Sequence, residues 1–224
     1  MDCAPIVMVK NEALYIRQIL APLVEVFGVA FVGDTGSQDG TAELAETVPG
    51  AVVTRYGEQN FRVLPQVRKR LCEQGEAQGL QWALMVDGDE LYHPDALRAI
   101  RAYTMPAGKR AGFVSMRSID RDEQGTFWEL NDLFSRLAIH PITDRHGGEY
   151  PFESPESFGN PAWFEYLPTV GGLEMYGIHL HRLDRSPLDD QVFMRKAKQF
   201  QFSLQDVQIP RTKPLEEPWL SLLR

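Results

Sequence analysis

The sequence contains little cysteine. Its 224 residues include only two, Cys3 and Cys72, which lie far apart and lack the spacing of metal ligands. A disulfide scaffold needs a dense, even set of cysteines, and a structural zinc site needs closely spaced pairs. Neither class fits this chain, so we expect two reduced thiols that pack as small, partly buried hydrophobic side chains.

Long apolar runs and an excess of positive charge are also missing. No stretch approaches the roughly 18 apolar residues of a transmembrane helix. Residues 1–12, MDCAPIVMVKNE, lack the basic start and apolar core of a signal peptide. We therefore expect a cytoplasmic protein without a membrane span. The net charge of −8 argues against a protein that coats nucleic acid, although a local basic patch can still bind phosphate.

Two common phosphate-binding motifs are absent as well. The sequence has neither G-x-x-x-x-G-K-[ST] nor G-x-G-x-x-G, so a P-loop and a dinucleotide-binding turn have no support. With 43% hydrophobic residues, the chain can bury one sizeable core but is short for two. One domain with an appendage is the expected organisation.

The first hundred residues alternate between strand and helix patterns. Short apolar runs rich in β-branched residues predict strands, and apolar positions at helical spacing predict helices. The predicted strands are 4–9, 28–34, 51–56 and 80–86, and the predicted helices are 11–27, 41–48 and 63–78. This order indicates βαβ units with right-handed crossovers, and hence an α/β fold with a largely parallel, doubly wound sheet.

The second half of the chain is less regular. Strand patterns cover 111–119, 125–130 and 174–183, and a helical pattern covers about 188–204. A long segment rich in glycine, proline and aromatic residues, 140–168, separates the later strands. Loops of this length are usually binding loops or lids, so the segment is a candidate for binding an acceptor.

Two aspartates one residue apart, Asp87 and Asp89, follow the strand predicted at 80–86. Ligands of open α/β sheets bind at the carboxyl ends of strands, and a hard cation can bridge carboxylates and a diphosphate there. A calcium-binding EF-hand loop does not fit, because Leu91 occupies its fifth position, where an oxygen ligand is needed. A solvated turn is the simplest alternative for an isolated Asp-x-Asp pair.

A second acidic motif, VGDTGSQDGT at residues 32–41, follows the second predicted strand. Asp34 comes directly after the apolar run, and the glycines and Ser37 permit a tight turn before the helix predicted from Thr41. The letters DTGS also occur in aspartic proteases, but those enzymes pair two such carboxylates in an all-β context. This chain has one copy between predicted helices, which disfavours that alternative.

Three motifs together resemble the family 2 glycosyltransferases, which have the A-type nucleotide-sugar transferase fold. The motifs are IVMVKNE at 6–12, VGDTGSQDGT at 32–41 and ALMVDGDE at 83–90. Two further segments are more weakly similar. Residues 60–71, which contain Arg68, resemble a helix that carries an arginine in that family. Residues 178–200 resemble the family's histidine-containing strand and the basic helix after it.

The resemblance implies a Rossmann-like, mostly parallel central sheet flanked by helices, with a smaller acceptor-side β/loop region. It also implies one domain over residues 1–204, with a donor half at 1–104 and an acceptor half at 105–204. Residues 205–224 would follow as a proline-containing tail.

The resemblance further implies a base pocket for a UDP-sugar. In it, Asp34 accepts hydrogen bonds from uracil, and the backbone near Val9 and Glu12 forms the rest of the pocket. A cation such as Arg68 stabilises the negative charge that develops on the departing UDP. A solvated helix face is the alternative role for Arg68.

A divalent metal, Mn²⁺ or Mg²⁺, is implied beside the base pocket. Asp87 faces the ribose and the metal, Gly88 belongs to the same donor-binding turn, and Asp89 ligates the ion that bridges the diphosphate. His181 is the preferred additional ligand. His179 lies two residues away and hence on the same face of the predicted strand, and a structural role is the alternative for either histidine.

Inverting transfer also needs a general base for the acceptor hydroxyl. Glu153, in the long loop, is the preferred candidate, and Asp132 and Glu149 remain alternatives. The sequence therefore predicts a metal-dependent, inverting glycosyltransferase. A non-catalytic nucleotide-sugar-binding or scaffold protein and a nucleotidyltransferase are the other hypotheses. The acceptor, whether saccharide, lipid, protein or modified nucleobase, and the oligomeric state are left open.

Overall fold

The structure is a computed structural model that describes residues 1–59, 64–109, 111–131, 134–142, 164–168, 176–180, 183 and 210–223. Its strands are β1 (Cys3–Val9), β2 (Ala30–Asp34), β3 (Ala51–Arg55), β4 (Trp82–Asp87), β5 (Glu90–Tyr92), β6 (Ala111–Arg121), β7 (Phe127–Leu130), β8 (Phe134–Pro141), β9 (Phe164–Tyr166), β10 (Gly177–His179) and β11 (Arg211–Pro214). The helices are α1 (Ile16–Phe27), α2 (Thr41–Glu46), α3 (Leu64–Ala77), α4 (Pro94–Ala102) and α6 (Trp219–Leu222). Within these residues, no helix is both long enough and apolar enough to cross a bilayer.

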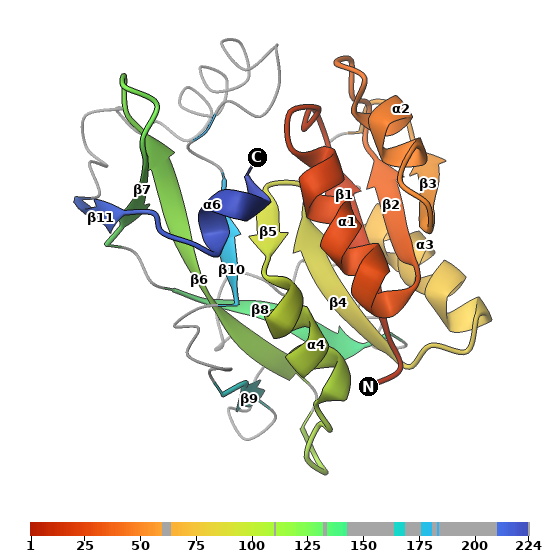
Figure 1. Cartoon of the computed structure of the whole chain (residues 1–224). Coiled ribbons are helices and arrows are strands. Elements are labelled where there is room, and N and C mark those ends of the chain that lie inside the picture. The colour runs from red at the N-terminus through yellow and green to blue at the C-terminus, as the bar shows by residue number, and fades with distance from the viewer. Residues whose placement is uncertain are drawn as a thin grey trace.

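The strands form a central mixed sheet in the order β11-β7-β6-β8-β4-β1-β2-β3 (Figure 1). The pairs β4–β1, β1–β2 and β2–β3 are all parallel. Strand β8 is antiparallel both to β4 and to β6. The predicted α/β class, with a Rossmann-like parallel core flanked by helices and a smaller β region beside it, is confirmed.

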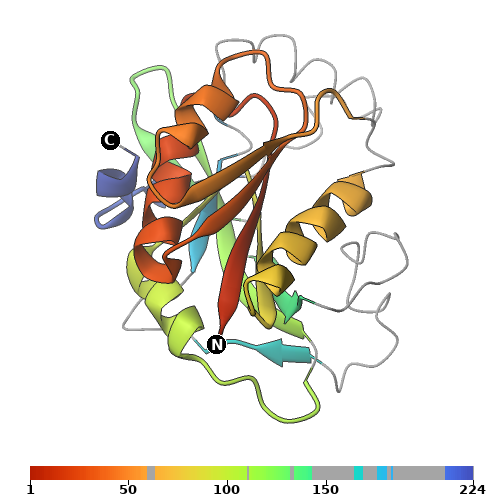
Figure 2. The same ribbon diagram turned by 90° about the vertical axis from the view of Figure 1, so that its right-hand side faces the viewer.

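Side chains of the parallel strands alternate between two apolar layers. Val7 and Val32 belong to the layer shared with α1 and α4, whereas Ile6, Phe31 and Met85 belong to the layer shared with α3. The two layers lie on opposite faces of the sheet, and Figure 2 shows α3 on the other side from α1 and α4. Burial on both faces explains why these strands are near-continuous apolar runs in the sequence.

The first helix begins later than its apolar pattern predicts. Helical spacing covers 11–27, but α1 starts at Ile16. Asn11 has a φ of 59°, in the left-handed region that Asn tolerates better than most residues. The backbone N–H groups of Asn11, Glu12 and Ala13 donate to the side chains of Ser37, Thr41 and Asp39, and these bonds fix the left-handed turn at Asn11 that precedes α1.

Three parts of the second half differ from the sequence expectation. Strand β8, which was not expected, lies between β4 and β6, and the short β9 lies within the segment treated as a loop. In the segment predicted as a proline-containing tail, residues 210–223 form β11 and α6 and bury Leu215, Trp219 and Leu223 in the core. The helix predicted at 188–204 lies outside the described residues.

Candidate functional site

The carboxyl ends of three parallel strands meet at one edge of the sheet. Val9 at the end of β1 pairs in register with Asp34 at the end of β2, and Met8 pairs with Asp87 at the end of β4. These strand ends are where open α/β sheets bind ligands. The two acidic motifs, which lie about fifty residues apart in the sequence, therefore come together in the fold.

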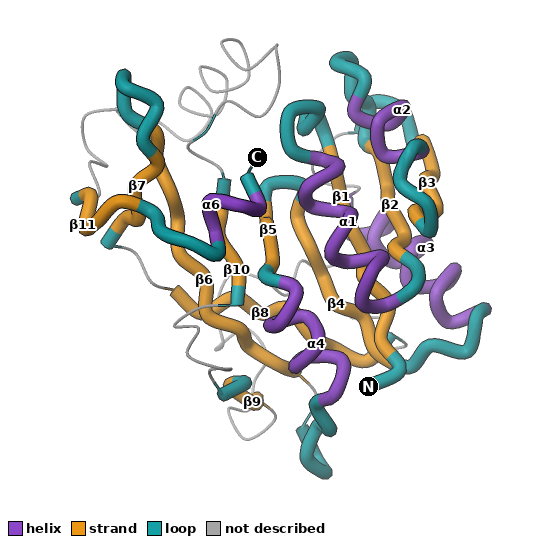
Figure 3. The backbone as a smooth tube through the Cα atoms, viewed as in Figure 1, coloured by secondary structure: helices purple, strands orange, loops and turns teal. Residues whose placement is uncertain are grey.

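Two loops at this edge are joined by hydrogen bonds. The loop after β1 donates Asn11 N–H to Ser37 Oγ (2.9 Å) and Glu12 N–H to Thr41 Oγ1 (2.8 Å). In return, Thr35 donates both its backbone N–H and its hydroxyl to the Val9 carbonyl, at 3.0 Å each. Figure 3 shows the two loops as the teal segments before α1 and α2. The site is thus built on a fixed loop pair.

Asp34 is buried, with 4% of its surface exposed. Its Oδ1 accepts from the backbone N–H groups of Gly36 and Ser37, both at 3.1 Å, and so holds the turn. Its Oδ2 is buried and has no hydrogen-bond partner among the described residues. A buried carboxylate oxygen without a donor is costly, which marks this atom as one that a ligand can satisfy.

Glycine is required at Gly88, in the turn between the two aspartates. A Cβ there would lie 2.8 Å from Glu12 Cγ, 3.1 Å from the Met8 carbonyl oxygen and 3.1 Å from Val9 Cγ1. The turn is also held by the Gly88 N–H, which donates to that Met8 carbonyl at 2.8 Å. Gly88 therefore lets the acidic turn pack directly against the end of β1.

Each aspartate of the acidic turn contacts a basic side chain from a distant element. Arg68 from α3, which is 5% exposed, forms an ion pair and a hydrogen bond with Asp87. His179 at the end of β10 places its Nε2 3.3 Å from Asp89 Oδ2. The strand β10 is held there by the Leu180 N–H, which donates to the Asp89 carbonyl at 2.7 Å. The turn is thus enclosed by α3 on one side and β10 on the other.

The sequence analysis did not single out Glu90. This residue is 2% exposed, and its Oε2 accepts from the Asp87 N–H at 3.0 Å, so it fixes the backbone of the acidic turn from within. Glu90 on β5 also pairs in register with His179 on the antiparallel neighbour β10. The only signal in the sequence is its position directly after the Asp-x-Asp pair, where a buried strand begins.

The structure brings together most of the residues chosen from the sequence. Asp34, Arg68, Asp87, Gly88 and Asp89 lie at the carboxyl edge of the parallel strands. The main-chain groups of Val9 and Glu12 are there too, but they bind the neighbouring loop: the Val9 carbonyl accepts from Thr35, and the Glu12 N–H donates to Thr41. Four other choices, His181, Glu153, Asp132 and Glu149, lie outside the described residues. His179, the other histidine considered, lies against Asp89.

The carboxylates of Asp87 and Asp89 have the donor chemistry that a hard divalent ion needs. Mg²⁺ and Mn²⁺ take oxygen ligands, and such ions are commonly held by one or two carboxylates together with substrate phosphates. Within the described parts of the chain, no three His, Cys, Asp or Glu side chains gather into a metal site. The residues present therefore fit an ion that a phosphate helps to bind.

Neither cysteine offers a reactive thiol, because both are buried. Desolvation raises the pKa of Cys3 to about 12 and that of Cys72 to about 11. Both cysteines are free and buried, as expected from the sequence. Since the thiolate is the reactive form, neither is a nucleophile at neutral pH.

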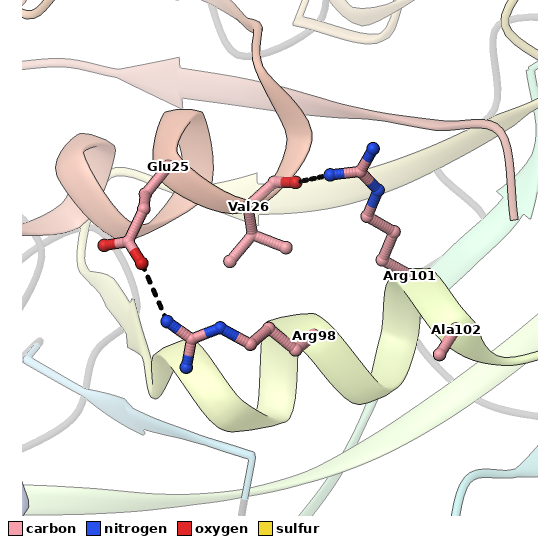
Figure 4. A pocket seen from close by; sticks show the side chains of 5 residues that line it. All are labelled: Glu25, Val26, Arg98, Arg101 and Ala102. Atoms are coloured by element: carbon pink, nitrogen blue, oxygen red, sulfur yellow. Dashed lines mark hydrogen bonds and ion pairs between the residues drawn. The ribbon is translucent and has the colours of Figure 1, made fainter.

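A surface hollow lies elsewhere, between the last turns of α1 and α4 (Figure 4). Its two arginines are already engaged: Arg98 pairs with Glu25 at 2.7 Å, and Arg101 donates to the Val26 carbonyl. It includes none of the acidic residues of the strand ends. This hollow is therefore separate from the candidate site at the strand edge.

No family model and no curated protein matches the chain. Among solved structures, it is similar to the glucosyl-3-phosphoglycerate synthase of Mycobacterium tuberculosis in complex with phosphoglyceric acid, with 18% identity and a TM-score of 0.37. That match covers 55% of this chain and 45% of the synthase, so the chain matches less than half of that protein. The same enzyme in complex with Mn²⁺, UDP and phosphoglyceric acid matches with 19% identity.

The chain is also similar to two other solved structures, which cover more of it. A glycosyltransferase involved in glycosylating the major capsid of PBCV-1 has 11% identity and a TM-score of 0.43, covering 86% of this chain and 99% of that chain. A 4-diphosphocytidyl-2C-methyl-D-erythritol synthase has 14% identity and a TM-score of 0.42, covering 62% of this chain and 75% of that chain. These are likenesses of backbone arrangement, and the case for a function rests on the residues of this chain.

Proposed function

We propose that this chain is a metal-dependent, inverting glycosyltransferase of the family 2 type, which transfers a sugar from a UDP-sugar to a hydroxyl acceptor. The observation that carries the proposal is the unpartnered Oδ2 of buried Asp34, beside the acidic turn of Asp87 and Asp89. A base-recognition group and a diphosphate–metal group then lie at the ends of β2 and β4, on either side of β1, where a nucleoside diphosphate can reach from one to the other.

The chemistry of Asp34 favours uracil. An ionised carboxylate only accepts hydrogen bonds, so its free oxygen suits a ring N–H donor. Uracil offers such a donor at N3, whereas cytosine presents an acceptor at the same ring position. The turn that Oδ1 holds through Gly36 and Ser37 keeps Oδ2 in one place before the ligand arrives. The base is therefore recognised by a preorganised acceptor.

The acidic turn and Arg68 fit the diphosphate. A divalent ion bound there would neutralise charge that develops on the departing UDP. Arg68 contributes a fixed positive charge next to Asp87. Glu90 holds the backbone of the turn by accepting from the Asp87 N–H. These residues bind and orient the leaving group, which is where negative charge accumulates during transfer.

The acceptor side of the proposal rests on residues outside the described part of the chain. Glu153 is the proposed general base, with Asp132 and Glu149 as alternatives. A Glu153→Gln variant should keep its affinity for UDP and Mn²⁺ but lose roughly 10²–10⁴-fold in turnover, the usual contribution of a positioned base. Retention of more than about a tenth of the turnover would clear Glu153 of this role.

The decisive experiment compares UDP and CDP binding by calorimetry in the presence of Mn²⁺. In Asp34→Asn, the amide oxygen can still hold the turn, but the second position becomes an N–H₂ donor facing the base. UDP binding should weaken by roughly 1.5–3 kcal/mol, the range for hydrogen bonds to a charged group. CDP binding should weaken less. A folded variant with unchanged UDP affinity would contradict the proposal.

A donor-hydrolysis assay separates transfer from binding alone. An enzyme of the proposed kind releases UDP slowly from its UDP-sugar to water when no acceptor is present, whereas a binding or scaffold protein holds the donor intact. UDP release above that of a buffer control, abolished by Asp89→Asn, is the expected result.

A further inference from the structure

Both carboxylates of the acidic turn already contact basic groups. Arg68 pairs with Asp87, and His179 Nε2 lies 3.3 Å from Asp89 Oδ2. A divalent ion that binds these aspartates must therefore share them with, or take them from, the two basic side chains. This competition makes the charge balance of the turn, rather than its carboxylates alone, the determinant of metal affinity.

Arg68 is the stronger of the two competitors because it is fixed in place. Its side chain is 6% exposed, and its Nε lies 3.0 Å from Met8 Sδ on β1, so the guanidinium is held between the strand and the turn. The guanidinium does not lose its proton in proteins, and so its charge stays at any ordinary pH. Asp87, by contrast, is 37% exposed on its side chain and can reach an ion from solvent.

A fixed cation beside Asp87 opposes a divalent ion by direct repulsion. Unit charges a few ångströms apart near a protein surface interact strongly enough to change an affinity by more than tenfold. A nucleoside diphosphate brings several negative charges to the same place, and these attract both the ion and the guanidinium. The diphosphate can accept from the guanidinium in place of Asp87, which frees that carboxylate for the ion. The competition with Arg68 is therefore relieved only when the nucleotide is present.

We infer that Arg68 couples the two ligands: the turn binds a divalent ion weakly until a nucleoside diphosphate occupies the site, and Arg68 is the residue that imposes this dependence. The inference rests on the proposed function, because it needs a nucleotide to bind at this edge. It goes further in assigning the coupling between the two ligands to one ion pair. By linkage, the ion must strengthen nucleotide binding by the same factor that the nucleotide strengthens ion binding.

The experiment measures Mn²⁺ affinity by electron paramagnetic resonance, with and without UDP, in wild-type protein, Arg68→Met and Arg68→Lys. Methionine removes the charge and keeps an unbranched, apolar side chain, and lysine keeps the charge. Without UDP, Arg68→Met should bind Mn²⁺ about tenfold more tightly than the wild type, and Arg68→Lys should stay close to the wild type. The gain in Mn²⁺ affinity on adding UDP should shrink in Arg68→Met alone.

Two outcomes would overturn the inference. One is a folded Arg68→Met that binds Mn²⁺ within twofold of the wild type in the absence of UDP. The other needs no variant: wild-type protein that binds Mn²⁺ equally well with and without UDP. If the wild type binds Mn²⁺–UDP without this coupling, only the inference fails. If it does not bind UDP under any metal condition, the proposed function fails with it.

Discussion

Side-chain interactions differ between the two halves of the sheet. At the carboxyl edge of the parallel half, the loops after β1 and β2 are joined mainly by hydrogen bonds between backbone and side-chain groups. In the mixed half, ion pairs are added to the backbone pairing of the strands: buried Glu129 on β7 pairs with Arg117 on β6 and lies 3.7 Å from the Lys213 ammonium on β11.

The difference follows from what each half has to do. Short backbone hydrogen bonds fix the geometry of a loop to a fraction of an ångström, which a binding edge needs. Ion pairs between strands tolerate longer distances. If one partner is lost, however, the other is left as an uncompensated buried charge, which destabilises the fold. The parallel half should therefore respond to small steric changes, and the mixed half to changes in charge.

The largest effect is expected from removing the charge at the centre of the mixed half. Glu129→Ala leaves Arg117 partly buried without its carboxylate, and loss of one partner of a buried pair typically costs roughly 3–5 kcal/mol. Urea unfolding measures the loss. The matched control is Glu43→Ala, which removes an exposed ion pair with Arg55 and should change stability little, since solvent screens it. Equal losses in both variants would contradict the comparison.

A steric test of the parallel half comes next. Gly36 has a φ of +98°, and a Cβ there would lie 2.5 Å from Glu58 Cα, so Gly36→Ala should cost roughly 2–4 kcal/mol through strain and overpacking. Gly40 has a similar φ of +89° but no atom within 4 Å of the same position. Gly40→Ala should therefore cost only the backbone strain, roughly 1–2 kcal/mol. Denaturant midpoints give the difference, and identical costs would show that the close approach to Glu58 is unimportant.

A smaller loss is expected from breaking one hydrogen bond between the loops. Thr41 is fully buried, and its Oγ1 accepts from the Glu12 N–H at 2.8 Å. Thr41→Val keeps the shape but leaves that N–H without its acceptor and also removes the hydroxyl that donates to Asp39 Oδ1 at 2.5 Å, at a cost of roughly 1–3 kcal/mol. Thr47→Val removes an exposed hydroxyl and should stay within about 0.5 kcal/mol of the wild type. A Thr41→Val protein as stable as Thr47→Val would remove this bond from the account.

The smallest effect is a pH dependence at the start of α4, which follows the acidic turn. Burial lowers the pKa of His93, with Asp95 opposing this and Arg98 adding to it. Neutral His93 Nδ1 accepts from the Asp95 N–H at 3.1 Å and caps the helix. Because the pKa is lowered in the folded state, the stabilisation is present above the ordinary histidine value of about 6.5 and is lost as pH falls through the lower folded value.

The check is to compare urea midpoints at about pH 7.5 and about pH 5.5, on either side of the ordinary histidine value. The midpoint of the wild type should fall further between the two than that of His93→Asn, because asparagine caps a helix without titrating in this range. A His93→Asn protein with the same acid dependence as the wild type would place that dependence at another group.

The parallel half could be predicted from the sequence because its signals are local. Strands buried on both faces are apolar runs, and Asp34 and Asp87 mark the points where those runs stop. A parallel sheet brings such ends to one edge, so the position of the site follows from the pattern alone. The late start of α1 could not be foreseen, since it depends on bonds from Asn11 and Glu12 to a loop that the pattern does not place.

The mixed half was less predictable because its pairings are long-range. Nothing in Phe134–Pro141 indicates that this strand lies between β4 and β6, since the partners are separated from it by many residues. The position of His179 has the same origin: it depends on where β10 ends and on its register with Glu90. The family resemblance predicted a histidine near the aspartates, and the strand pairing places His179 beside Asp89.

The position of β8 also has a consequence for the order in which the chain folds during synthesis. Strands β1 to β4 leave the ribosome first and can pair with one another, but β4 keeps an open edge until residues 134–141 emerge. Strand β6 is made before β8, although in the finished sheet β8 separates it from β4. An open strand edge invites pairing with the wrong partner. The nascent chain is therefore most exposed to misassembly and aggregation between the completion of β4 and the arrival of β8, when the carboxyl ends of the parallel strands are already in place.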